Sequence, residues 1–259
     1  MYEHILFSTT GGVATLTLNR PEFFNAINEK IGLEIQDALK TVAKDITIRV
    51  LVITGSGKAF CSGQDLKEIS PSENYSLGEA VKRKYIPIIK GITGLEKPVI
   101  CRLNGIAAGA GCSIALACDL IVASENASLC EVFINIGLVL DSGASFFLPR
   151  LAGTKKAFEY ATLATKISAK EAFEIGMINK IVPENELDSA VNELSVKYAK
   201  APTKAIGMIK KLLHQSFNSS LDEMLEKEAW YQEIAGRSQD YKEGVKAFIE
   251  KRKPAFGGF

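Results

Sequence analysis

The feature that most constrains the fold is an alternation of apolar, strand-like runs with amphipathic, helix-like stretches. The runs are rich in β-branched and aliphatic residues, as in buried strands, whereas the stretches carry apolar residues at helical spacing. The strand-like runs are residues 49–54, 98–103 and 119–124, and the helical stretches are residues 28–42, 76–93 and 109–117. This alternation is typical of parallel βαβ units, so we expect an α/β fold.

The two ends of the chain differ from this pattern. Residues 4–18 predict a β-hairpin that turns at Gly11-Gly12, because residues 13–18 (VATLTL) alternate as a half-buried strand does. From about residue 184 to residue 251 the pattern is helical almost throughout. We therefore expect an α/β core over residues 1–197 and a helical region over residues 198–259.

Composition and charge exclude several classes of function. The 31 basic residues almost balance the 30 acidic ones, so no overall field favours nucleic acid or an anionic membrane. No apolar run reaches the roughly 18–20 residues of a membrane span, and the first residues lack the features of a signal peptide. We expect a cytoplasmic protein that binds neither nucleic acid nor membrane.

Cofactors and metal ions are also not expected. The five cysteines are an odd number without zinc-type spacing, which favours reduced thiols, and the two histidines lie far from them in sequence. The glycines at Gly109 and Gly111 lack the third glycine of a dinucleotide-binding fingerprint. The predicted site therefore holds no metal and no separate cofactor.

Two glycine-rich loops each follow a predicted strand. They are residues 57–66 (GKAFCSGQDL) and residues 105–113 (GIAAGAGCS), and the second opens a predicted helix. Glycine permits close approach of the backbone, and a helix start leaves amide N–H groups unpaired. One amide from each loop would form an oxyanion hole, although glycine-rich turns also serve packing alone.

A single carboxylate, Asp141, follows the apolar run of residues 136–140 and precedes the small residues 142–145. Burial of an unpaired carboxylate is costly, so such a residue usually has a partner or a use. Two roles fit Asp141, and they are compatible with each other. It is a general base whose pKa is raised by its apolar setting, or it is the N-cap of a helix that begins near Ser142.

The two loops, together with residues 18–28 (LNRPEFFNAIN) and 142–153 (SGASFFLPRLAG), resemble the crotonase superfamily, which contains the enoyl-CoA hydratases and isomerases. The resemblance extends over nearly the whole chain. It implies a core of ββα turns arranged as a spiral, with C-terminal helices that cover the active site and form a homotrimer or homohexamer. It also implies an acyl-CoA substrate, of which coenzyme A is a part, whose thioester oxygen is bound by the backbone amides of Ser62 and Ala110.

The resemblance also suggests which residues contact the substrate. They are Arg20, Ala26, Lys58, Ala59, Ser62, Gly63, Gln64, Asp65, Leu66, Gly109 and Ala110. The phosphates of coenzyme A would meet Arg20, Lys58 and Lys67, with residues 251–253 (KRK) reaching a neighbouring subunit.

The resemblance favours an isomerase. Hydratases of the superfamily use two glutamates, and the corresponding positions here are Ser113 and Phe133. Asp141 matches the acidic residue of certain isomerases of the superfamily. Among these, the sequence most resembles the ring-epoxide isomerases of phenylacetate catabolism. We expect Asp141 to be a single general base that shifts a double bond, or isomerises a ring epoxide, through an enolate.

Two alternatives stay open. The first is an enoyl-CoA hydratase that adds water to an α,β-unsaturated acyl-CoA, which requires another carboxylate at the acyl carbons: Glu131, Glu68 or Glu73. The second, more distant one is a non-catalytic paralogue that only binds acyl-CoA.

Overall fold

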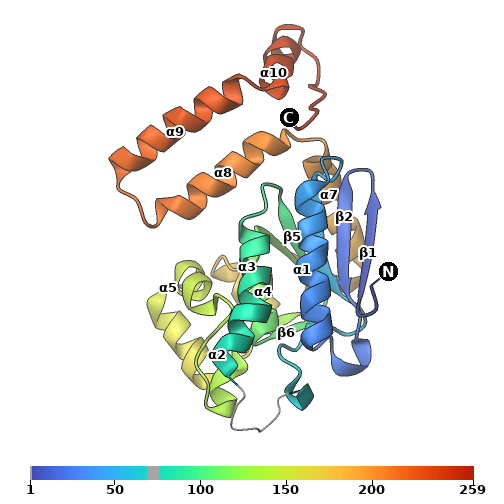
Figure 1. The fold of residues 1–259 in the computed structure, drawn as a ribbon, viewed down its shortest axis with the longest axis vertical. Helices are drawn as coiled ribbons and strands as arrows, with labels where there is room; N and C mark the ends of the chain where they lie inside the picture. Colours follow the sequence, from blue (N-terminus) through green and yellow to red (C-terminus); the bar gives the residue numbers. More distant parts are fainter. Residues whose placement is uncertain (1, 69–75) are drawn as a thin grey trace.

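A six-stranded sheet is the larger of two sheets in the computed structural model, which describes residues 2–68 and 76–259 (Figure 1). Its order is β1-β2-β3-β5-β7-β10, with bounds Ile5–Thr10, Val13–Leu18, Val50–Gly55, Val99–Leu103, Leu120–Ser124 and Lys180–Val182. β1 and β2 form the expected hairpin, and the other neighbours are parallel. The prediction of parallel βαβ units is confirmed.

A smaller sheet is built from short strands that directly follow the long ones. It has the order β4-β6-β8-β9, with bounds Ala59–Cys61, Ile106–Ala108, Ser128–Cys130 and Ile167–Ser168. The chain thus passes from β3 to β4, from β5 to β6 and from β7 to β8, contributing one strand to each sheet in each turn. These short strands lie in segments whose sequence pattern indicates loops, and only the family resemblance predicted them.

Helices cover the two sheets. The longer ones around the core are α1 (Glu29–Lys44), α3 (Ile86–Thr93), α4 (Ala110–Ala117), α5 (Ala144–Leu163) and α7 (Leu187–Ala199). Shorter elements are α2 (Leu77–Ala80), α6 (Ala169–Glu174), a π-helix η3 (Val81–Tyr85), and the 3-10 helices η1 (Pro21–Phe23), η2 (Leu66–Glu68), η4 (Val132–Ile136) and η5 (Glu184–Glu186). Asn28 caps α1, because its side chain accepts the Ile31 N–H at 2.9 Å.

The main core lies between the large sheet and the helices on one of its faces. It includes Leu16, Ile31, Leu51 and Ile88, which are essentially inaccessible to solvent. A second cluster on the other face joins α7 to β3 and β7. Packing on both faces explains why the central strand β3 is buried at every position.

The last three helices extend away from this core (Figure 1). They are α8 (Thr203–Ser216), α9 (Leu221–Gly236) and α10 (Gln239–Ile249), and α10 lies at the opposite end of the molecule from α2. Large apolar side chains remain exposed on these helices and directly after α8: Leu213, Phe217, Trp230, Phe248 and Ile249. Among the helices that the structure describes, none is long and apolar enough to span a membrane.

Candidate active site

The site is built around the start of α4. Gly109 precedes this helix with φ +52°, and its N–H donates to the Cys130 carbonyl at 2.9 Å. Ala110 is the first helical residue, so its amide N–H points out of the helix end without an intrahelical acceptor. The helix start therefore offers an amide donor at a position fixed by β8.

The loop that follows β4 packs against this helix start. Gly63 has φ +90°, and a Cβ atom on it would lie 2.8 Å from the Ala108 oxygen and 3.3 Å from the Ala110 nitrogen. Glycine is needed here for both the backbone conformation and the close approach. The two glycine-rich loops are thus in contact, as the oxyanion-hole interpretation requires.

The amides of this first loop are not equally available. The Ser62 N–H donates to the Phe24 carbonyl at 3.0 Å, and the Asp65 N–H donates to the Ile27 carbonyl at 3.1 Å. The Gly63 N–H lies 3.4 Å from the Cys61 sulfur. Within residues 2–68 and 76–259, no acceptor is found for the Gln64 N–H.

The assignment of Ser62 as an oxyanion donor therefore needs correction, since its amide is already used to hold the loop that contains Phe24. The sequence could not reveal this, because the acceptor lies 38 residues earlier in the chain, in a segment without regular structure. Gln64 was expected to contact substrate only. Among residues 62–65, it is the one whose amide has no acceptor in the described part of the chain, and this amide remains available beside that of Ala110.

Arg20 and Asp65 form a buried ion pair that fixes the same loop. Arg20 Nη1 lies 3.0 Å from Asp65 Oδ2 and donates to the Ala26 carbonyl at 2.7 Å. Both side chains are almost fully buried, so Arg20 does not present its charge to solvent. Its expected contact with coenzyme A phosphates is contradicted, and its role here is to tie residues 20–26 to Asp65.

The remaining predicted contact residues fall into two groups. Ala26 and Ala59 are buried, and their carbonyls accept hydrogen bonds from side chains of the same region, so both belong to the scaffold. Lys58, Leu66 and Lys67 are exposed, and the Lys67 Nζ lies 5.4 Å from the centroid of the Phe23 ring. Both lysines are accessible to an anionic ligand.

Asp141 lies between η4 and α5 and is half-buried. Burial raises its pKa, while the hydrogen bond from Ser142 Oγ, at 2.7 Å, and the charge of Lys84 lower it. The backbone oxygen of Asp141 accepts the Ala144 N–H at 3.0 Å. The N-cap of α5 is Gly143 and makes no side-chain cap, so the interpretation of Asp141 as a capping residue is wrong.

The other candidate carboxylates are placed differently. Glu131 precedes η4 and is completely buried, and neither of its carboxyl oxygens has a hydrogen-bond partner among the described residues. Its pKa is raised to about 8, mainly by burial and also by the charge of Asp141, whereas the Cys112 thiol acts to lower it. Glu68 is exposed and accepts the Glu29 N–H at the start of α1, and Glu73 lies outside the described residues.

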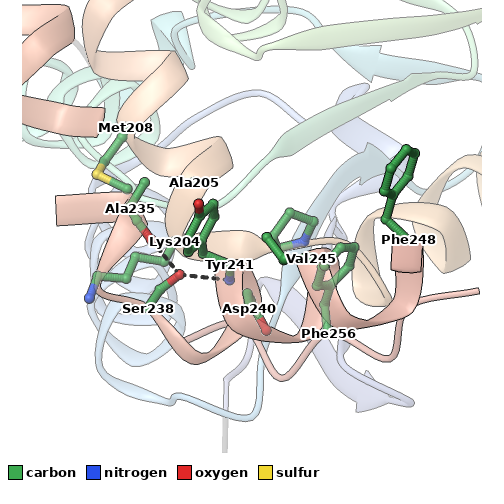
Figure 2. A pocket seen from close by; sticks show the side chains of 12 residues that line it. Lys204, Ala205, Met208, Ala235, Ser238, Asp240, Tyr241, Val245, Phe248 and Phe256 are labelled. Atoms are coloured by element: carbon green, nitrogen blue, oxygen red, sulfur yellow. Dashed lines mark hydrogen bonds between the residues drawn. The ribbon is translucent and has the colours of Figure 1, made fainter. Parts of the chain in front are cut away.

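A groove of about 410 Å³ lies elsewhere, among the C-terminal helices (Figure 2). It is lined mainly by apolar side chains from α8, α10 and the residues after α10, including Met208, Val245, Phe248 and Phe256. Its lining contains neither Asp141 nor any residue of the two glycine-rich loops. The groove is therefore distinct from the candidate active site.

Comparison with known proteins identifies the family. The model of the enoyl-CoA hydratase/isomerase family matches residues 8–258. The chain is 42% identical to the 1,2-epoxyphenylacetyl-CoA isomerase of Escherichia coli K12 over the full length of both proteins. It is 35% identical to the crotonyl-CoA hydratase of Syntrophomonas wolfei, with 98% of each chain covered.

Solved structures agree with this result. The crystal structure of the enoyl-CoA hydratase from Bacillus anthracis superimposes with a TM-score of 0.94 at 32% identity, covering 99% of this chain and 100% of that one. The fold shared at this level and the glycine-rich loops agree with the predicted spiral of ββα turns. The chain is an enzyme of the enoyl-CoA hydratase/isomerase family, the crotonase superfamily.

Proposed function

We propose that this enzyme is an acyl-CoA isomerase that shifts a double bond, or isomerises a ring epoxide, with Asp141 as its general base. The single observation that carries the proposal is the setting of Asp141: its half-buried carboxylate with a raised pKa lies between η4 and α5, in the segment that packs against the start of α4. The similarity to a 1,2-epoxyphenylacetyl-CoA isomerase supports the same class of reaction.

The proposed reaction on a β,γ-unsaturated acyl-CoA needs one proton carrier. The Asp141 carboxylate removes a proton from the α-carbon, the electron pair of that C–H bond forms a double bond to the thioester carbon, and the carbonyl π pair moves to the thioester oxygen, which gives a dienolate. The amides of Gln64 and Ala110 donate to this oxyanion, which stabilises it without reorganisation. The protonated Asp141 then returns the proton to the γ-carbon, leaving the α,β-unsaturated product and a regenerated carboxylate.

The hydratase alternative is supported by relatives that are named as hydratases, such as the crotonyl-CoA hydratase of Syntrophomonas wolfei. Hydration requires one group that activates water and another that delivers a proton. Glu131 is the further carboxyl whose pKa responds to Asp141. It is fully buried, and its oxygens have no hydrogen-bond partner among the described residues, so its setting is a poor one for a group that activates water. The isomerase is therefore the better-supported function.

The test is to incubate the purified protein separately with a β,γ-unsaturated and an α,β-unsaturated acyl-CoA. The isomerase proposal predicts conversion of the first compound into the second, with no hydroxyacyl-CoA formed from either. Rapid formation of 3-hydroxyacyl-CoA would instead establish the hydratase, and tight binding without turnover of either compound would establish a protein that only binds acyl-CoA.

We also propose that the C-terminal helices join copies of this chain into a homotrimer or homohexamer and cover the active site. The exposed apolar side chains of α8, α9 and α10, and the apolar groove of Figure 2, support an interface, because a free surface of this kind is unfavourable in water. Light scattering coupled to gel filtration tests it. A Phe248→Asp, Ile249→Asp variant should elute as a smaller species, whereas a monomeric wild-type protein would refute the proposal.

A further inference from the structure

Glu131 is a buried acidic residue that the proposed mechanism does not use. Glu131 is completely inaccessible to solvent, and both of its carboxyl oxygens lack a hydrogen-bond partner among the described residues. A carboxylate in such a place would be strongly destabilised, whereas a protonated carboxyl is tolerated. At neutral pH the group is therefore uncharged, and it cannot lose its proton without cost to the structure around it.

The position of Glu131 connects this cost to the active site. Its neighbour Cys130 accepts the Gly109 N–H at 2.9 Å, directly before the amide of Ala110. On the other side, a Cβ atom on Gly109 would lie 3.4 Å from Val132. Residues 130–132 therefore pack against the start of α4, and the chain runs from there through η4 to Asp141.

Among the residues that the structure describes, no cation acts directly on the pKa of Glu131. Burial raises the pKa of Glu131 to about 8, the Cys112 thiol on α4 acts to lower it, and the Asp141 carboxylate acts to raise it. The nearby Cys130 thiol feels the charges of both Glu131 and Lys166, and Lys84 acts on Asp141. Ionised Glu131 would thus be opposed by the charge of a second carboxylate, with only the Cys112 thiol acting in its favour.

We propose that Glu131 is a positioning residue for Asp141: its uncharged carboxyl lets residues 130–141 pack against α4, and loss of its proton displaces the base from the substrate. This inference rests on the proposed role of Asp141. It predicts that turnover falls at alkaline pH because Glu131 loses its proton, and not because a catalytic group does.

The experiment compares the pH dependence of kcat for isomerisation in wild type, Glu131→Gln and Glu131→Met, from about pH 6 to about pH 9.5. Gln keeps the shape and Met keeps the length of the side chain, and neither ionises. Glu125→Gln, at an exposed position after β7, is the control for loss of a glutamate charge.

In wild type and in Glu125→Gln, kcat should fall at least about tenfold between about pH 7 and about pH 9.5. In either Glu131 variant that folds, the fall should be less than about twofold, with KM nearly unchanged throughout. A protonated-carboxyl band in the infrared spectrum at neutral pH should be present in wild type and absent from Glu131→Gln.

The opposite results overturn the inference. If kcat still falls at alkaline pH in a Glu131 variant, another group causes the fall. If kcat of the wild type does not fall at alkaline pH, the inference is excluded before any variant is made. Asp141→Asn separates the two levels of the argument. If that variant stays active, the proposed function fails, whereas an inactive Asp141→Asn with unaltered pH profiles in the Glu131 variants refutes the role of Glu131 alone.

Discussion

The hydroxyl of Ser113 donates a hydrogen bond to the backbone oxygen of Asp141, with Ser113 Oγ and Asp141 O 3.3 Å apart. The same Oγ lies 3.3 Å from the Gly109 oxygen, and Ser113 is completely buried. Ser113 thus links the segment that carries the proposed base to the helix start that carries the proposed oxyanion donor. A position that the family resemblance relates to a hydratase glutamate has here become a link between these two segments.

Loss of Asp65 should destabilise the protein strongly. In Asp65→Ala the Arg20 guanidinium stays buried without its charged partner, and the side chains are only 8% and 9% exposed in the intact pair. We expect the free energy of unfolding to fall by about 3–5 kcal/mol, measured by urea denaturation. Lys197→Ala removes the exposed Lys197–Glu193 pair and should cost less than about 1 kcal/mol. Equal losses in both variants would contradict the structural role of the Arg20–Asp65 pair.

Removal of the Ala110 amide should impair catalysis without unfolding the enzyme. Proline is accepted at the first position of a helix, so Ala110→Pro removes the N–H at little structural cost. We expect kcat to fall by about 10²–10³, because one oxyanion donor is lost. Ser62→Ala should stay within about twofold of wild type, since the Ser62 amide binds Phe24.

The same measurements distinguish Gln64 from Ser62 as the second donor. Replacing Gln64 by its α-hydroxy acid analogue exchanges the N–H for an ester oxygen and should lower kcat as Ala110→Pro does. The corresponding replacement of Ser62 removes the hydrogen bond to Phe24 and should lower the thermal midpoint more than kcat. A loss of turnover confined to the Ser62 analogue would restore the original assignment.

The large sheet could be predicted from sequence because its strands are long apolar runs. β3 and β5 are buried by packing on both faces, which gives them near-continuous apolar sequences. The strands of the small sheet have three residues or fewer and contain Ala, Cys and Ser. Periodicity cannot identify segments of that length, so the spiral followed only from the family resemblance.

The loops of the candidate site could be predicted from the sequence, but its individual amide donors could not. Gly63 and Gly109 mark positions of positive φ, and the sequence shows them directly. Which N–H is free depends on partners far away in sequence, as the bond from Ser62 to Phe24 shows. The burial of Arg20 was missed for the same reason, since Asp65 lies 45 residues from it.

The pH dependence of turnover should reflect the burial of Asp141. Burial raises its pKa above the ordinary value of about 3.9, and the base acts only when ionised. We therefore expect kcat/KM to fall as the pH is lowered through this raised pKa, with a midpoint clearly above that of an exposed aspartate. Because the folded state holds this proton more tightly than the unfolded state, Asp141 also makes the protein less stable as the pH rises across the same interval. An acid limb centred near 3.9 would contradict this.

Binding of coenzyme A should depend moderately on salt through Lys58 and Lys67. Both side chains are exposed, with Lys58 inside the first glycine-rich loop and Lys67 directly after it, whereas Arg20 is paired with Asp65. We expect Lys58→Ala with Lys67→Ala to raise the Kd of acyl-CoA about three- to tenfold at low ionic strength, and to reduce its salt dependence, in calorimetric titrations. Lys40→Ala with Lys44→Ala makes the same charge change on the later turns of α1 and should leave the Kd nearly unaltered.

Replacement of the proposed base should abolish isomerisation while leaving the fold intact. Asparagine matches aspartate in shape, and its side-chain oxygen can still accept the hydrogen bond from Ser142 Oγ. It cannot take up a proton at neutral pH, so in Asp141→Asn turnover should fall by at least about 10²–10⁴. The thermal midpoint should be nearly unchanged or raised, since a partly buried charge has been removed. In D₂O the wild type should incorporate deuterium at the α- or γ-carbon, and Asp141→Asn should not. Because the Asp141 side chain caps no helix, near-normal isomerisation by a pure Asp141→Asn preparation would exclude the one-base mechanism and direct the search to Glu131.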